Sequence, residues 1–196
     1  MKRKFTFLLM ALLALAGLQG WAQRGYTYEL VTSFPSTPDP ADEYVLGYSD
    51  GTNYYFHETG ENAGAMTLAA PSANTKVYTF AKEKLYDFLP IVYPVAKCNG
   101  KYLYIYSQTV KLTPTMEGSV DIDNGQVTND NRDYYVYADG SIIKSYAWGD
   151  GMPAGGHPLS FYKRTGSAAP TYAVTVTSDT EGCTASADKA SYEEGE

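Results

Sequence analysis

The chain has 196 residues, 44% of them hydrophobic, with 22 acidic and 15 basic side chains and a formal net charge of −7. An acidic field repels phosphate backbones and anionic lipid surfaces, and no basic cluster offsets it. The composition therefore argues against a nucleic-acid-binding protein or a membrane-surface protein.

The N-terminus predicts secretion. Three cations at residues 2–4 precede an apolar run over residues 5–18, which has the length of a signal-peptide core. A membrane anchor is the alternative, but the run is shorter than the roughly 20 residues that a bilayer requires. Small residues at Gly20 and Ala22 place cleavage after Ala22, so residues 1–22 are the predicted signal peptide. Losing three of the 15 cations would leave a net charge near −10.

Four two-residue turns predict an all-β body. A type I′ hairpin needs positive φ at its central residues, which Asn-Gly and Asp-Gly supply at little cost. The turns, flanked by runs rich in Tyr, Val, Ile and Thr, are Asp50-Gly51, Asn99-Gly100, Asn124-Gly125 and Asp139-Gly140. One short helix is expected over residues 82–89. We expect nine or ten strands arranged as an antiparallel barrel or a two-sheet sandwich.

A small-residue segment over 165–170, with Gly166 and Pro170, is the predicted linker between two differently composed parts. Tyrosine dominates the all-β module at 23–164, whereas Thr, Ser, Ala and Glu dominate 171–196. The second part contains two strands and the start of a third, fewer than an independent β-module needs. We therefore expect the chain to be a fragment of a longer extracellular protein.

Residues 172–177 (YAVTVT), the Glu181-Gly182 turn, and residues 187–191 (ADKAS) with 193–196 (EEGE) resemble the opening half of bacterial surface repeats related to internalin-type B-repeats. The resemblance implies a truncated, small β-grasp-like spacer in a secreted or surface protein.

The larger part carries a second resemblance at its two ends. Residues 28–33 (YELVTS), 43–47 (EYVLG) and 159–164 (LSFYKR) are similar to an all-β module that recurs in secreted proteins of Gram-negative gut anaerobes. The central hairpins depart from that module. The resemblance implies an architecture and an extracellular location, and it carries no activity.

No catalytic constellation stands out. His57 and His157 are one hundred residues apart, and His57-Glu58 lacks the second His of a zinc-binding helix. Neither a nucleophile elbow nor a phosphate-binding loop is present, and Cys98 has no thiol-protease signature. Carboxylate pairs for glycoside hydrolysis could form in space, but 22 acidic residues offer no choice between them. We predict no catalytic residue and no cofactor.

Asp121 and Asp123 begin an acidic, amide-rich stretch that ends at Asp133. Oxygen-rich loops of this kind can hold calcium, but the EF-hand register fails because Gly125 comes one position early and the distal Glu is missing. The favoured interpretation is a hairpin and a solvated loop, with Asp121 and Asp123 as the alternative calcium ligands.

Tyrosine occurs 19 times, more than one core needs. Residues 102–106 (YLYIY) alternate, so that Leu103 and Ile105 can face a core while the tyrosines face outward. The predicted ladder consists of Tyr102, Tyr104 and Tyr106, extended by Tyr135 and Tyr137. Such a ladder could stack on sugar rings or bind a protein. Alternatively, the tyrosines cover the flanks of the fold.

The loop over residues 148–158 (WGDGMPAGGHP) follows the ladder and holds the only Trp of the mature chain. Loops on a rigid β scaffold are common binding sites. The binding candidates here are Tyr146, Trp148, Asp150 and His157. Equally, Trp148 could plug one end of the fold.

The leading interpretation is a non-catalytic extracellular module that binds a glycan or a host or bacterial surface protein. Two alternatives remain: an accessory domain of a secreted hydrolase whose catalytic part lies outside this chain, and a purely structural spacer. The free or paired state of Cys98 and Cys183 also stays open, although two cysteines in different modules favour free thiols.

Overall fold

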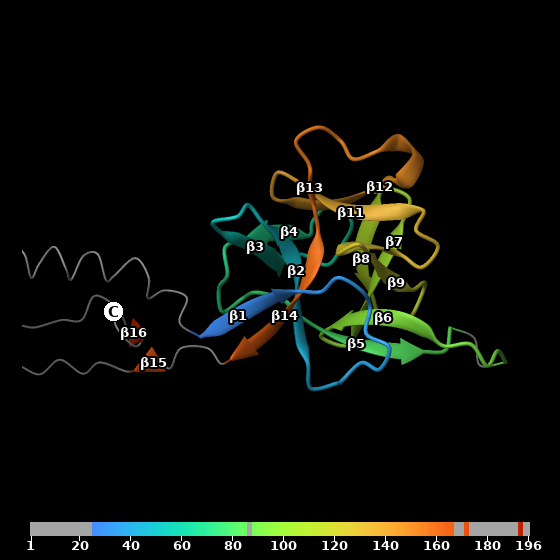
Figure 1. Ribbon diagram of the computed structural model, residues 1–196, viewed down its shortest axis with the longest axis horizontal. Helices are drawn as coiled ribbons and strands as arrows, with labels where there is room; N and C mark the ends of the chain where they lie inside the picture. The colour runs from blue at the N-terminus through green and yellow to red at the C-terminus, as the bar shows by residue number, and fades with distance from the viewer. Residues whose placement is uncertain (1–24, 86–87, 167–170, 173–191, 194–196) are drawn as a thin grey trace, which may run out of the picture. The chain divides into compact units, whose positions relative to one another are not determined.

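A computed structural model describes residues 25–85, 88–166, 171–172 and 192–193 (Figure 1). The chain divides into two compact units, Tyr28–Thr165 and a second made of Met1–Thr27 with Gly166–Glu196. In the second unit β15 (Thr171–Tyr172) pairs antiparallel with β16 (Tyr192–Glu193). The predicted signal peptide, nearly all of the predicted surface repeat and Cys183 lie outside the described residues.

The fold is all-β, as predicted. A 14-stranded antiparallel sheet accounts for β1 to β14. Its strands are β1 Tyr26–Leu30, β2 Glu43–Ser49, β3 Tyr54–Thr59, β4 Thr67–Ala69, β5 Val77–Glu83, β6 Tyr93–Cys98, β7 Lys101–Tyr106, β8 Thr109–Thr113, β9 Val120–Asp123, β10 Gln126–Asn129, β11 Tyr134–Asp139, β12 Ile142–Ala147, β13 His157–Pro158 and β14 Ser160–Gly166. The described residues form no α-helix and include one 3-10 turn, η1 Trp148–Asp150. None of them forms a helix long and apolar enough to cross a bilayer.

The helix expected over residues 82–89 is wrong, because Lys82 and Glu83 continue β5 and pair with Pro94 and Tyr93 of β6. A helix of eight residues has little stability of its own, and the buried alternation of β5 outweighs it.

The sheet is not closed, so it is a sandwich or open sheet rather than a barrel. Its order is β8-β7-β6-β5-β2-β3-β4-β12-β11-β10-β9, with β14 beside β2, β1 beside β14, and β13 beside β11. The two ends of this path fold over each other, since β7 contacts β9, β10 and β11 while β8 contacts β12 (Figure 1). The four Gly-containing turns each join consecutive antiparallel strands, as predicted.

The two Asn-Gly turns have positive φ at both central residues, with Asn99 at 50° and Asn124 at 49°. The Asp-Gly turns have it at the glycine only. In the β2–β3 turn the Asp50 carboxylate accepts the backbone N–H groups of Thr52 and Asn53 instead. The asparagines therefore form the type I′ geometry that the sequence predicts, and Asp50 stabilises its turn through side-chain hydrogen bonds.

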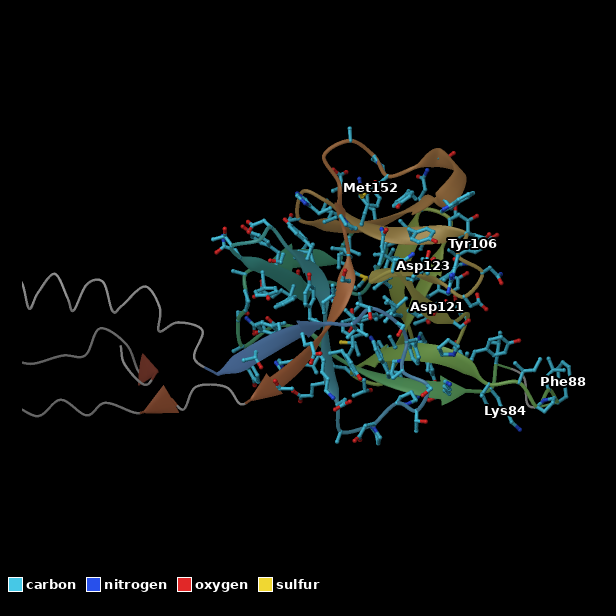
Figure 2. All side chains as sticks on the ribbon, in the orientation of Figure 1. Lys84, Phe88, Tyr106, Asp121, Asp123 and Met152 are labelled. Atoms are coloured by element: carbon cyan, nitrogen blue, oxygen red, sulfur yellow. The ribbon has the colours of Figure 1, made fainter. Side chains whose placement is uncertain are left out.

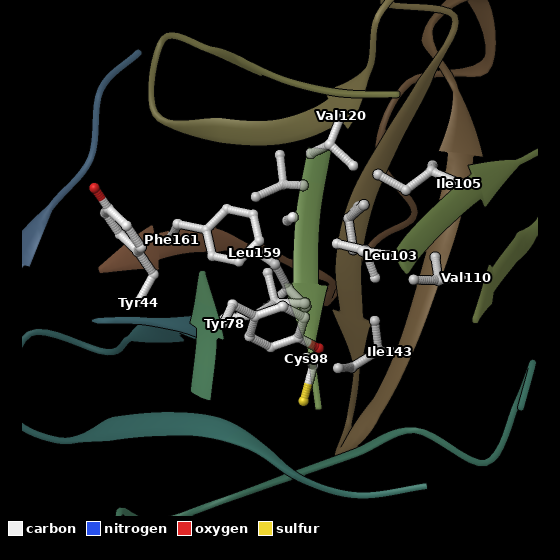
Figure 3. Close-up of a cluster of buried hydrophobic side chains, with 14 of the residues drawn as sticks. Tyr44, Tyr78, Cys98, Leu103, Ile105, Val110, Val120, Ile143, Leu159 and Phe161 are labelled. Atoms are coloured by element: carbon white, nitrogen blue, oxygen red, sulfur yellow. The ribbon is translucent and has the colours of Figure 1, made fainter. Parts of the chain in front are cut away.

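The main core lies between the folded-over layers of the sheet (Figure 3). Leu103 and Ile105 face into it, as the alternation of residues 102–106 predicts. The Phe161 ring meets the Phe80 ring edge-on at 4.9 Å, and Tyr44 stacks on Phe80 at 3.8 Å. Aromatic pairs of this kind add to the free energy gained from burial alone.

His57 is fully buried beside this core. Its Nε2–H is shared by the carbonyl oxygens of Thr59 and Gly60, each at 3.0 Å, so Nδ1 accepts the Tyr78 hydroxyl at 2.7 Å. Burial lowers the pKa of His57. Nearby, Cys98 is a free, buried thiol whose pKa burial raises. Both side chains are therefore neutral parts of the interior.

Candidate functional site

Strand β11 divides the predicted tyrosines into two groups. Tyr134, Val136 and Ala138 lie on the side of β11 that faces the main core. Tyr135 and Tyr137 lie on the other side, and each is only 7% exposed. The five tyrosines of the predicted ladder therefore do not form one continuous surface.

Of the three β7 tyrosines, Tyr102 and Tyr104 are half-buried and Tyr106 is exposed. The Tyr102 hydroxyl donates to Glu83 at 2.7 Å, and the Lys97 ammonium lies 4.5 Å from the Tyr102 ring centre. Tyr104 is half-buried, with the Lys111 ammonium 5.0 Å from its ring centre. Tyr106 is 58% exposed and lies at the surface (Figure 2). Of the three, Tyr106 offers the most free ring surface.

Aromatic residues gather where β7 and β12 end and β11 begins. The Tyr106 ring lies 6.3 Å from that of Tyr104 and 5.6 Å from that of Tyr134. Tyr134 pairs with Ala147, and the next residue, Trp148, donates its backbone N–H to the Asp133 carbonyl at 2.8 Å. We call Tyr104, Tyr106, Tyr134 and Trp148 the aromatic rim.

Polar side chains fix the backbone under the aromatic rim. The Asn129 side-chain oxygen accepts the N–H groups of Asp133 and Tyr134 at 2.9 and 3.0 Å. The Ser145 hydroxyl donates to the Ser107 carbonyl at 2.8 Å, which ties the β7–β8 turn to β12. The rim is therefore attached to the rigid sheet, although Trp148 itself is 72% exposed. The alternative in which Trp148 plugs the end of the fold is excluded by this exposure.

The second group of tyrosines covers a flank of the sheet. The Tyr146 ring lies 5.9 Å from Tyr135 and 5.6 Å from Tyr137. Burial, together with the hydroxyl's 2.7 Å hydrogen bond to Asp123, raises the pKa of Tyr135 to about 12. Gly156 approaches the Tyr137 ring so closely that a Cβ there would lie 2.7 Å from it. Tyr135 and Tyr137 are consequently covered.

The calcium candidates Asp121 and Asp123 bind an arginine. The Arg132 guanidinium lies 3.1 Å from each carboxylate, and these partners raise its pKa. No group of three or more His, Cys, Asp or Glu side chains suited to a metal occurs within the described ranges. A guanidinium between the two carboxylates opposes a second cation by charge repulsion.

The two remaining candidates of the loop, Asp150 and His157, lie in different surroundings. Asp150 is exposed in η1, two residues after Trp148. His157 instead stacks on Tyr48 at 4.4 Å with the ring planes 3° apart, and Tyr48 stacks on Tyr55 at 5.0 Å. His157 thus belongs to an aromatic column with Tyr48 and Tyr55, two residues that the sequence analysis missed.

The sequence analysis also missed Tyr134, although a signal for it was present. Val136 and Ala138 alternate with the tyrosines of β11 just as Leu103 and Ile105 alternate with those of β7. Placing Val136 and Ala138 toward the core would have put Tyr134 on their side of the strand and Tyr135 on the opposite one.

A different exposed apolar area lies at the tip of the β5–β6 hairpin, at Phe88, Ile91 and Val92. Phe88 is labelled in Figure 2. Phe88 is 80% exposed. Two of the three residues are aliphatic, which distinguishes this tip from the rim of tyrosines and tryptophan.

Comparisons of the chain with protein-family models, with curated proteins and with solved structures found no match.

Proposed function

We propose that residues 23–164 form a non-catalytic extracellular binding module of a secreted or surface protein, which takes a glycan or a protein at the aromatic rim. The signal peptide predicted from residues 1–22 supports the extracellular location. The observation that carries the proposal is the exposure of Tyr106, whose ring lies beside that of Tyr134, and of Trp148, whose backbone is hydrogen-bonded to Asp133 next to Tyr134.

Exposed aromatic rings on a rigid support favour binding for two reasons. A Tyr or Trp ring offers a large apolar face with few rotatable bonds, so little conformational entropy is lost on contact. The ring pairs and the Asn129 and Ser145 hydrogen bonds also hold the backbone of the rim in place before a ligand arrives. A site organised in this way spends less of its contact energy on ordering.

Replacing Trp148 tests the proposal. Screens of the module against immobilised polysaccharides and extracellular proteins would identify a ligand. We then expect Trp148→Ala to weaken binding by about 1–2 kcal/mol, roughly 5- to 30-fold, because the ring contact is lost. Isothermal titration calorimetry measures the change.

Phe88→Ala is the matched control, since it removes a ring outside the rim that is at least as exposed as Trp148. Its affinity should equal that of the parent. A folded Trp148→Ala protein with unchanged affinity would remove Trp148 from the site.

A further inference from the structure

Resting on the proposed function, we infer that the aromatic rim binds a neutral polysaccharide and rejects anionic polymers. The chemistry around the rings distinguishes this ligand class from both acidic glycans and protein partners. Three side chains carry the distinction: Asp130, Asp133 and Asp150.

These carboxylates adjoin the rim along the chain and are exposed. Asp133 directly precedes Tyr134, and its carbonyl accepts the Trp148 N–H. Asp150 belongs to the same 3-10 turn as Trp148. Within the described ranges none of the three forms an ion pair. The surroundings of the rim therefore carry uncompensated negative charge.

The cations of this region are already paired. Lys111, which lies over the Tyr104 ring, is 3.2 Å from the Glu117 carboxylate. Arg132 is held between Asp121 and Asp123. An incoming carboxylate or sulfate would meet no unpaired cation from these two side chains, and would meet the repulsion of three carboxylates.

A neutral sugar chain suits the same surroundings. The C–H face of a pyranose packs on Tyr or Trp rings, while its hydroxyls donate to carboxylates in charge-assisted hydrogen bonds. A protein partner fits less well, because the centres of protein interfaces are depleted in charged residues.

The test is affinity electrophoresis and calorimetry at about 20 mM salt. The protein used is the whole chain after removal of the predicted signal peptide, residues 23–196. The neutral probes are galactomannan, xyloglucan and mixed-linkage β-glucan, and the anionic probes are polygalacturonate and chondroitin sulfate. We expect at least one neutral polymer to bind, with at least tenfold weaker binding of both polyanions. Trp148→Ala should abolish most of the neutral binding.

The variant Asp133→Asn/Asp150→Asn should lower the ratio of the affinity for the neutral polymer to the affinity for a polyanion by about 3- to 10-fold. We expect the change at low salt, since screening is weak there. The matched control is Glu29→Gln/Glu58→Gln, which changes net charge equally. Glu29 in β1 and Glu58 in β3 form no ion pair within the described ranges, so their removal frees no cation. The control should leave the discrimination unchanged.

If a polyanion bound as tightly as the neutral polymer or more tightly, the inference would be wrong, although the proposed binding module would stand. If a protein but no neutral polymer bound through Trp148, the inference would likewise be wrong and the binding module would stand. An equal change of this affinity ratio in both double variants would also overturn the inference. The effect would then come from net charge and not from the carboxylates near the rim.

Discussion

The aromatic side chains of the interior and those of the rim are of the same types, but different contacts fix them. Inside, rings are held on every side: Phe161 lies against Phe80, and the Tyr78 hydroxyl donates to His57. At the rim, Tyr106 and Trp148 are largely exposed, and it is their backbone neighbours that hydrogen bonds hold. The contacts of the interior rings therefore do not involve Tyr106 or Trp148.

This difference means that substitutions of interior aromatics and of exposed aromatics should affect different properties, the first the stability of the fold and the second the affinity for a ligand. Substitutions of interior aromatics leave cavities or unpaired polar groups, both of which destabilise the folded state. Substitutions of exposed rings away from such features change stability by less than about 0.5 kcal/mol. Aromatic positions can therefore be ranked by their effect on the free energy of unfolding, and the exposed Tyr106 and Trp148 should come last.

The largest effect is expected from Phe161→Ala. Phe161 is fully buried in the main core, and its loss combines the transfer free energy with a cavity. We expect the free energy of unfolding to fall by about 3–5 kcal/mol in urea titrations. Trp148→Ala is the surface counterpart and should stay within about 0.5 kcal/mol of the parent. Similar losses for both would break the division between interior and rim.

The next effect is a loss of stability in mild acid through His57. Burial lowers the pKa of His57 in the folded state, the Lys76 charge acts in the same direction, and Glu61 opposes it. The unfolded chain therefore takes up the proton first. The His57 contribution is complete above the unfolded pKa of about 6.5 and is lost as the pH falls toward the folded value.

We expect the free energy of unfolding to decline between pH 7.5 and 5.5 with a slope of at most about 1.4 kcal/mol per pH unit from this group. NMR titration of the His57 imidazole checks the cause. A His57 that titrates in the folded protein at about 6.5 or above, the value of an unperturbed imidazole, would contradict the expectation. His57→Gln, if folded, should flatten the slope.

How much of the fold the sequence predicts depends on whether the contacts are local or join distant parts of the chain. Turn chemistry and the alternation of residues 101–106 predict local strands and hairpins, and these were correct. The pairing of β14 with β2 and of β4 with β12 joins segments far apart in the chain, which local patterns do not encode. A sandwich and a barrel therefore could not be separated.

The candidate site shows the same limit at the level of single residues. Tyr106 and Trp148 were found because an alternating strand and a glycine-rich loop mark them. Tyr135 and Tyr137 are covered instead, since Gly156 of a distant loop packs on Tyr137 and Asp123 binds the Tyr135 hydroxyl. Neither contact has a signature in the sequence around β11.

The smallest effect, and the sharpest comparison, removes one hydroxyl from each kind of tyrosine. Tyr135→Phe deletes the 2.7 Å hydrogen bond to Asp123 on a covered flank, whereas Tyr106→Phe deletes a hydroxyl at an exposed position. We expect Tyr135→Phe to cost about 1 kcal/mol in urea titrations and Tyr106→Phe to cost almost nothing. Both variants keep the ring, so neither creates a cavity. If Tyr106→Phe destabilised the protein as much as Tyr135→Phe, the Tyr106 hydroxyl would be a structural group, and the rim would belong to the folded core rather than to a surface that is free for a ligand.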